Sequence, residues 1–223
     1  MANSSWQVSQ DTASRSLSTH KVLRNTYMML ALTLLFSALT AGVAMSMGVG
    51  RMNIFVLLIG AYGLMFLVHK TANSTAGIFA TFAFTGFMGF TIGPVLNAYM
   101  SLPNGAQLVM TALGMTGITF AGLSAVALVT RKDFSFLSNF LFAGAIVLIL
   151  AMLAAMIFNI SGLALAVSAG FVLFASAAIL FETSQIIHGG QTNYLLATVS
   201  LYVSIYNMFL SLLALLGFAS SDD

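Results

Sequence analysis

The sequence contains no cysteine and very little charge. Only 5% of its 223 residues are charged, whereas 60% are hydrophobic; a soluble globular domain carries about 25% charged residues. The absence of cysteine excludes disulfides and thiolate metal sites. A chain with so few charges has too little polar surface to face water, and its mean hydropathy of +1.02 predicts that lipid is its solvent.

Sequence patterns typical of catalysis and of nucleic-acid binding are also absent. The chain has 7 Lys and Arg residues against 5 Asp and Glu residues, so its pI of about 9.1 reflects scarce charge and not a basic patch. It contains neither H-E-x-x-H nor G-x-S-x-G. We therefore predict no catalysis, no cofactor, no metal site and no nucleic-acid partner.

Apolar runs predict an all-α membrane protein with seven transmembrane helices, since a spanning helix needs about 20 apolar residues. Residues 71–130 form an uncharged run of 60 residues, and SLPNG at 101–105 divides it because Pro and Asn-Gly interrupt helices. The run at 54–68 is short and needs snorkelling ends or a thinned bilayer. The predicted spans are approximately 27–47, 54–68, 76–100, 106–129, 134–158, 163–181 and 194–218.

Two polar tails flank this transmembrane domain of residues 25–219. Residues 1–24 lack the apolar core of a cleavable signal peptide and are predicted to be a disordered tail. Residues 220–223 form the other, short tail. Basic residues gather on one side of this topology, which places the N-terminus in the cytoplasm and the C-terminus outside it. The cytoplasmic set is Arg15, Lys21, Arg24, Lys70, Arg131 and Lys132, against Arg51 alone on the other side.

Small residues recur at helical spacing in several spans, which predicts packing seams. They include Gly86, Gly89 and Gly93 in span 76–100, and Gly114, Gly117 and Ala121 in span 106–129. Span 194–218 differs because its stripe is polar over its whole length, and polar side chains facing lipid are costly. This predicts a place near the bundle centre or along a hydrated path, while packing alone explains the stripe equally well. The stripe comprises Asn193, Ala197, Ser200, Ser204, Asn207, Ser211 and Ala214.

Glu182 is an acid at the edge of a long apolar run, because the 21 residues before it carry no charge. It lies on the small-residue face of span 163–181, so we expect it to point toward span 194–218 at the cytoplasmic mouth of the bundle. An ionisable residue in a membrane span is a functional candidate. The alternative is an interfacial glutamate that snorkels to water. No basic residue lies within a span, so its candidate partners are His188, Lys70, Lys21 and Arg24.

Two segments resemble the Bax inhibitor-1 family. They are GFTIGPVLNAY at 89–99, which contains Gly89, Gly93 and Pro94, and ILFETSQIIHGGQTNYLLATVSLYVSIYNMFLSLLALLG at 179–217. With STHKVLRNTY and TRKDFSFL, they are similar to the YccA-type branch of bacterial inner-membrane proteins, over residues 18–219. The resemblance implies six helices surrounding a central seventh. It also implies one of two activities: binding and restraining the membrane AAA protease FtsH with HflK–HflC, or a pH-sensitive calcium leak through an acidic pair.

The family's acidic pair maps only in part onto this chain. Its first acid corresponds to Glu182, but the second falls on Ser204 in LYVSIYNMF, where Asn207 completes the pattern. Calcium favours several charged oxygen ligands, and two close carboxylates titrate as a coupled pair. A single carboxylate puts calcium binding in doubt, although a proton-dependent hydrogen bond between Glu182 and Ser204 remains open. Glu182, Ser204 and Asn207 are therefore the candidate proton or cation sensor.

The sequence thus predicts a multi-pass regulator of membrane proteolysis in the bacterial inner membrane, acting on FtsH with HflK–HflC in quality control or stress response. The alternative is a calcium or proton leak gated at Glu182. Ser204 argues against the leak because it removes one of the two charges.

Overall fold

Seven helices make up the described part of the chain. The computed structural model describes residues 3–220, with side chains from residue 19 onward. The helices are α1 (Asn3–Ser46), α2 (Ile54–Thr71), α3 (Ala76–Met100), α4 (Gly105–Thr130), α5 (Leu137–Phe158), α6 (Ser161–Ile187) and α7 (Tyr194–Ala219). All seven contain a segment long and apolar enough to cross a membrane, which confirms the prediction of an all-α membrane protein.

Two helices run further into polar sequence than the apolar runs indicated. α2 includes His69, Lys70 and Thr71, so its 18 residues reach about 27 Å at 1.5 Å per residue. α6 continues to Ile187 and ends before Gly189, which has a positive φ of 77°. Glu182 therefore lies inside α6 and not at its end.

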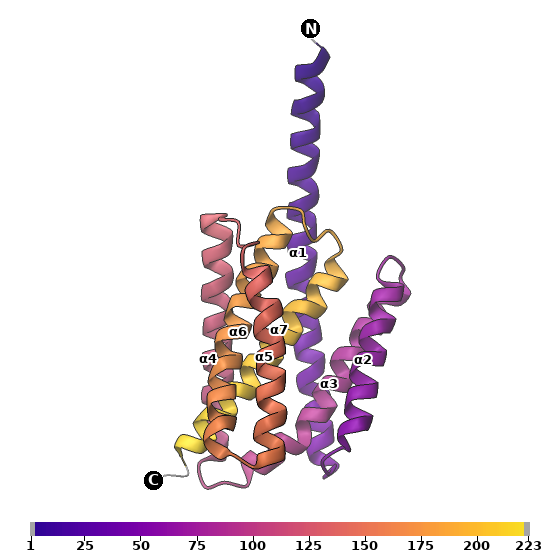
Figure 1. Cartoon of the computed structure of the whole chain (residues 1–223). Coiled ribbons are helices and arrows are strands. Elements are labelled where there is room, and N and C mark those ends of the chain that lie inside the picture. Colours follow the sequence, from indigo (N-terminus) through magenta and orange to yellow (C-terminus); the bar gives the residue numbers. More distant parts are fainter. Residues whose placement is uncertain (1–2, 221–223) are drawn as a thin grey trace.

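The N-terminal segment differs from the expected disordered tail of residues 1–24, because α1 is helical from Asn3. Residues 3–41 contain neither Pro nor Gly, so nothing in this stretch interrupts a helix that continues from the first span. Figure 1 shows this half of α1 extending well beyond the bundle. Residues 1–2 and 221–223, the latter in the expected short tail, lie outside the described residues.

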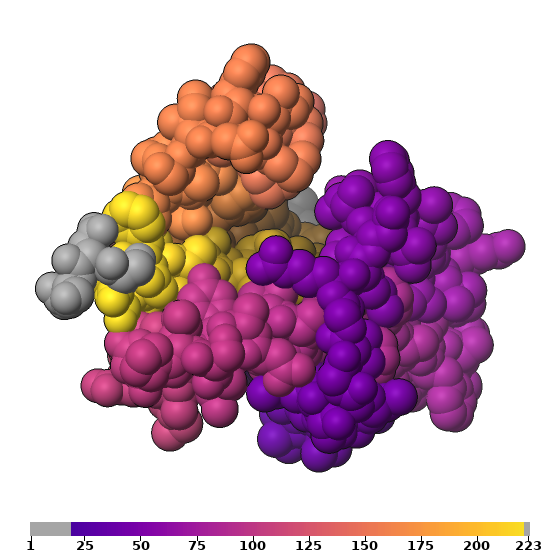
Figure 2. Space-filling model, turned by 90° about the horizontal axis from the view of Figure 1, so that it is seen from below, coloured from indigo at the N-terminus to yellow at the C-terminus, as the bar shows by residue number. Residues whose placement is uncertain are grey.

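The seventh helix occupies the centre of the bundle, as expected. It packs against α1, α2, α3, α4 and α6, and it crosses the bundle obliquely (Figure 1). The expected ring of six is incomplete, because over the described residues α5 packs against α6 alone. Seen from the end opposite the N-terminus, α7 lies between the α5–α6 hairpin, in orange, and the turn from α3 to α4, in magenta (Figure 2).

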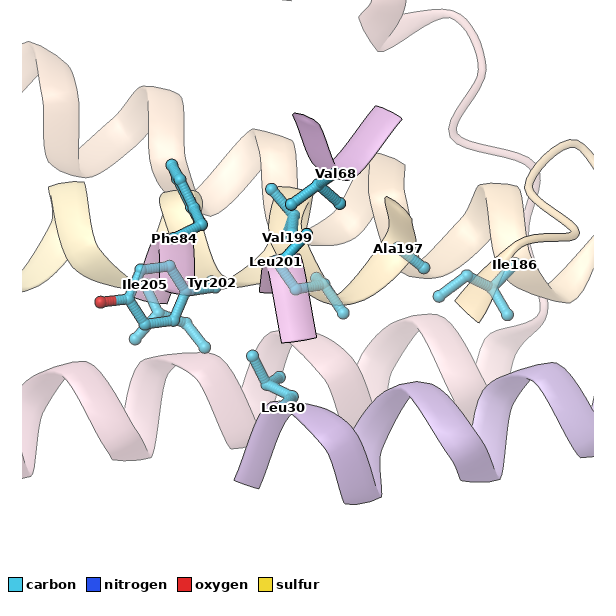
Figure 3. Close-up of a cluster of buried hydrophobic side chains, with 10 residues drawn as sticks. Leu30, Val68, Phe84, Ile186, Ala197, Val199, Leu201, Tyr202 and Ile205 are labelled. Carbon is cyan, nitrogen blue, oxygen red and sulfur yellow. The ribbon is translucent and has the colours of Figure 1, made fainter. Parts of the chain in front are cut away.

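One of two apolar cores packs side chains from four other helices onto one length of α7 (Figure 3). Their contributions are Leu30 from α1, Val68 from α2, Phe84 from α3, Ile186 from α6, and Ala197, Val199, Leu201, Tyr202 and Ile205 from α7. α2 and α5 each have a single buried residue, Val68 and Ala155. The centre of the fold is therefore α7 with the faces of α1, α3 and α6 that enclose it.

Gly89 and Gly93 of the family motif allow α1 and α3 to approach closely. A Cβ on Gly93 would meet the Ala44 side chain at 2.5 Å, and one on Gly89 would overlap the backbone carbonyl and side chain of Ser37. Pro94 is buried beside them in α3. The packing seam predicted for α3 is confirmed.

The seam predicted for α4 is wrong at its glycines, since a Cβ on Gly114 or Gly117 would meet no atom within 4 Å. These positions face open space, and over the described residues no Cα of α1 lies within 8 Å of a Cα of α4.

Replacing Gly89 should therefore weaken the bundle, whereas replacing Gly114 should not. We expect Gly89→Ala to destabilise the protein by about 1–3 kcal/mol, because an overpacked interface forces the helices apart. Gly114→Ala should be neutral or stabilising by up to about 1 kcal/mol, since Ala has the higher helix propensity. Thermal unfolding in one detergent measures both, and equal stability of the two variants would contradict the close approach of α1 and α3.

Candidate functional site

Glu182 and Ser204 meet between α6 and α7. The Ser204 hydroxyl lies 3.3 Å from Oε1 and 3.2 Å from Oε2 of Glu182, and 3.2 Å from the Ser200 carbonyl oxygen. Ser204 is buried and Glu182 is partly buried. The hydroxyl has one proton, so it donates to one of these oxygens at a time. The structure thus brings together the two positions that the sequence paired.

This arrangement supplies a hydrogen bond to the carboxylate but no countercharge. An ionised carboxylate in apolar surroundings is costly unless it is paired, and over residues 3–220 Ser204 is its hydrogen-bond partner. No group of three or more His, Cys, Asp or Glu side chains able to hold a metal ion occurs among the described residues. The geometry can hold a proton between oxygen atoms, and it gives a divalent cation one carboxylate and one hydroxyl.

The basic residues expected to pair with Glu182 do not contact it. His188, Lys70, Lys21 and Arg24 are all exposed, and none forms an ion pair with Glu182 in the part of the chain described. The Nδ1 atom of His188 instead lies 2.9 Å from the Ser184 carbonyl oxygen and 3.3 Å from its hydroxyl. The reason is depth: six residues along a helix place His188 about 9 Å nearer the bundle end than Glu182.

Asn207, the third expected sensor residue, does not join this pair. It lines a cavity of about 380 Å³ between α5, α6 and α7, with Met152, Phe171 and Ser211 among the other lining residues. Its side-chain amide has no hydrogen-bond partner among the described residues. The polar stripe of α7 therefore divides, with Ser204 facing Glu182 and Asn207 facing the space that α5 leaves open.

Sequence reasoning missed two sets of hydroxyl contacts between helices at the centre of the bundle. The Tyr202 hydroxyl donates to the Thr85 carbonyl oxygen at 3.2 Å and accepts from the Ser37 hydroxyl at 2.6 Å. The hydroxyl oxygens of Tyr206 and Thr91 lie 3.4 Å apart. The available signal was the pair Tyr202 and Tyr206 in the central helix, because a buried tyrosine hydroxyl usually finds a partner.

Asn193 also caps the start of α7, a role that its place in the polar stripe of α7 did not predict. Its Oδ1 accepts hydrogen bonds from the backbone N–H groups of Leu195 and Leu196, which caps the start of α7. Its Nδ2 donates to the Ala72 carbonyl oxygen and to Oδ1 of Asn73, both at 2.9 Å. Asn193 thereby fixes the beginning of α7 to the turn between α2 and α3. An Asn directly before an apolar run was the available signal.

The loop between α4 and α5 lies at the same end of the bundle as the turn between α2 and α3 (Figure 1). Asp133 accepts hydrogen bonds from the hydroxyl and the backbone N–H of Ser135, which hold the pKa of Asp133 below its usual value. The Ser184 hydroxyl on α6 accepts from the Phe134 N–H at 3.0 Å and lies 3.3 Å from the Lys132 carbonyl oxygen. These bonds attach the loop to the last turns of α6, next to the turn that carries Glu182.

Comparison with known proteins identifies the family of this bundle. The family model described as "Inhibitor of apoptosis-promoting Bax1" matches residues 19–221. The chain belongs to the Bax inhibitor-1 family. Within the family, it is 59% identical over 202 residues to an uncharacterised protein of Pseudomonas aeruginosa, with 91% of each chain covered.

Two further relatives carry names. The chain is 55% identical over 206 residues to the "Modulator of FtsH protease YccA" of Escherichia coli, covering 92% of this chain and 94% of the relative. A relative from another Escherichia coli strain, with the same identity and coverage, is named "Inner membrane protein YccA". The match to the family extends over all seven helices of the bundle, with Glu182 and Ser204 inside it.

Loss of the Tyr202 hydroxyl should destabilise this family member. Tyr202→Phe leaves the buried Ser37 hydroxyl and the Thr85 carbonyl without their shared partner, and we expect a cost of about 1 kcal/mol, as for other hydrogen bonds between membrane helices. Tyr62→Phe is the matched control because Tyr62 is 67% exposed on α2. Thermal unfolding of Tyr202→Phe, Ser37→Ala and the double variant measures the coupling. Strict additivity of the two changes would contradict a direct bond.

Proposed function

We propose that this protein is a regulator of membrane proteolysis in the bacterial inner membrane, which binds the AAA protease FtsH together with HflK–HflC and modulates its activity in quality control or stress response. The observation that carries the proposal is the 55% identity, over nearly the whole chain, to a protein named as a modulator of FtsH. Affinity purification from the native membrane in a mild detergent tests it. Stoichiometric recovery of FtsH supports the proposal, and its absence opposes it.

The shape of the molecule supports this role. α1 extends beyond the bundle at one end (Figure 1), and Lys21, Arg24, Lys70, Arg131 and Lys132 lie at that same end. By the positive-inside rule this end is cytoplasmic, and an ATP-driven protease requires an accessible segment on its own side of the membrane. We propose that the protruding segment is gripped while the packed bundle resists extraction, so that the protein occupies the protease.

This orientation can be tested with reporters. Because the helices alternate in direction, the loop at 131–136 should be cytoplasmic and the C-terminus after α7 should be on the opposite side. A periplasm-dependent reporter fused after Asp223 should be active, and the same reporter inserted in the 131–136 loop should be inactive. The reverse pattern would mean that the basic end faces outward.

The grip on the N-terminal segment should show in protein turnover. Deleting residues 2–18 should lengthen the lifetime of the protein in cells while FtsH still co-purifies with the bundle. The matched control is deletion of residues 221–223, which should leave the lifetime unchanged. Pulse-chase labelling measures both. An unchanged lifetime of the first deletion would show that these residues are not the gripped segment.

A proton-dependent leak is the second candidate, favoured by the contact between Glu182 and Ser204. In the wild type one carboxylate beside one hydroxyl is a poor calcium site. Ser204→Asp restores the missing charge, and two adjacent carboxylates share a proton at low pH and repel each other at higher pH. We expect vesicles with Ser204→Asp to show a pH-dependent calcium leak, which Glu182→Gln in the same protein removes. A strong calcium leak from the wild type would favour the channel over the protease modulator.

A further inference from the structure

α1 and α4 both flank α7, yet over the described residues no Cα of one lies within 8 Å of a Cα of the other, and they meet through side chains such as Tyr27 and Phe120. Two cavities lie along the seam between them. One, of about 630 Å³, is lined by α1 residues of the basic end and by Leu128 of α4. The other, of about 410 Å³, lies deeper and is lined by residues of α1, α3, α4 and α7. We call them the basic cavity and the apolar groove.

The basic cavity combines positive charge with an apolar wall. Its lining includes His20, Lys21 and Arg24 together with Leu23, Tyr27 and Leu128. The two carboxylates among the described side chains are engaged elsewhere, Asp133 with Ser135 and Glu182 with Ser204. The positive charge of the cavity is therefore not neutralised by a carboxylate of residues 19–220. A phosphate group attached to hydrocarbon has the complementary chemistry.

Two buried hydroxyls on the seam also lack partners. The Tyr27 hydroxyl on α1 and the Ser124 hydroxyl on α4 have no hydrogen-bond partner among the described residues. Ser124 lies between Phe120 and Leu128 at a spacing of four, which places all three on one face of α4. The Tyr27 ring packs against Phe120 with centroids 5.9 Å apart. Of the two residues, Tyr27 lines the basic cavity. Both hydroxyls are buried, so the cavity offers a ligand its charged side chains and not these hydroxyls.

The apolar groove continues the same seam into the membrane. Its α1 wall includes Leu34 and Ala38, its α4 wall includes Leu113 and Gly117, and Phe120 joins its upper end. Leu34 and Ala38 lie about 15 and 21 Å along α1 from Arg24, at 1.5 Å per residue. Half of a bilayer's hydrocarbon core is about 15 Å thick. An acyl chain whose headgroup sits at Arg24 therefore reaches the upper part of this groove.

We infer that the seam between α1 and α4 binds an anionic phospholipid of the leaflet at the basic end. Its phosphate occupies the basic cavity, paired with Lys21 and Arg24, and an acyl chain lies in the apolar groove against Gly117. The occupant is a lipid, and not a partner helix, because charge at the mouth and hydrocarbon along the seam match the two ends of one amphipathic molecule. The inference stands independently of the protease role.

Lipid binding by the purified full-length protein tests the charged end of the site. Native mass spectrometry in a neutral detergent measures retention of added phosphatidylglycerol, phosphatidylcholine and inorganic phosphate. Lys21→Gln with Arg24→Gln should weaken phosphatidylglycerol binding by about 25-fold, since each basic residue near anionic lipid contributes about fivefold. The matched control is Arg131→Gln with Lys132→Gln, which removes the same charge at the same end from exposed positions outside the cavity.

The control should bind like the wild type, and phosphatidylcholine should bind weakly. An equal loss in both double variants would overturn the proposal, because it would show general attraction to charge. Inorganic phosphate that binds as tightly as phosphatidylglycerol would also overturn it, because the site would then hold a free anion.

A second pair of variants tests the apolar groove. Gly117→Leu and Gly122→Leu both place a side chain on α4 where a Cβ meets no atom within 4 Å, but only Gly117 lines the groove. Gly117→Leu should reduce phosphatidylglycerol retention severalfold while Gly122→Leu leaves it unchanged. Equal retention in the two variants would overturn the proposal. If Gly117→Leu instead abolished FtsH recovery and kept the lipid, the groove would be a docking site for a protein helix.

Discussion

Polar groups inside a membrane bundle have little water to bond with, so they bond to carbonyl groups of their own helix or to groups of neighbouring helices. Most of this structure follows from how α7 meets that requirement. The Tyr202 hydroxyl bonds to Ser37 of α1 and to the Thr85 carbonyl of α3, and Ser204 bonds to Glu182 of α6. These contacts face three different helices. A helix with polar groups on several sides has to lie at the centre, and α7 does.

The same constraint defines what Glu182 can do. It lies one and a half turns inside the end of α6, where the exposed basic residues of the bundle end do not reach it, and its partner is a hydroxyl. The site supplies a single carboxylate held between two helices. The geometry suits a group that holds or releases a proton in a packed bundle better than one that binds a divalent cation.

Much of the fold could be predicted because a segment that crosses a lipid bilayer has to be long and apolar. Apolar runs of about 20 residues predict spans, and the family resemblance together with the polar stripe of α7 pointed to the central helix. The ends of the helices were harder to predict, because the helices continue through polar residues such as His69 and Lys70 beyond the apolar runs. The glycines of α4 show a second limit: spacing along a helix defines a face, but not whether another helix packs against it.

The sequence predicted only part of the candidate site. The family pattern placed Glu182 opposite Ser204, and the structure shows them in contact. It did not indicate that Asn207 turns toward α5, because that depends on how α5 sits outside α6. Ser37 and Tyr202 are 165 positions apart in sequence, so no local pattern predicts the bond between their hydroxyls.

The central claim is that Tyr202 and Ser204 of α7 are partnered by protein and not by water. The chain has no cysteine, so a single introduced thiol reports on one position without background. Ser204→Cys, in native membranes, should resist a membrane-impermeant thiol reagent applied from either side, while Thr192→Cys in the exposed turn before α7 should react. Rapid modification of Ser204→Cys would show water at the centre of the bundle and would contradict the account.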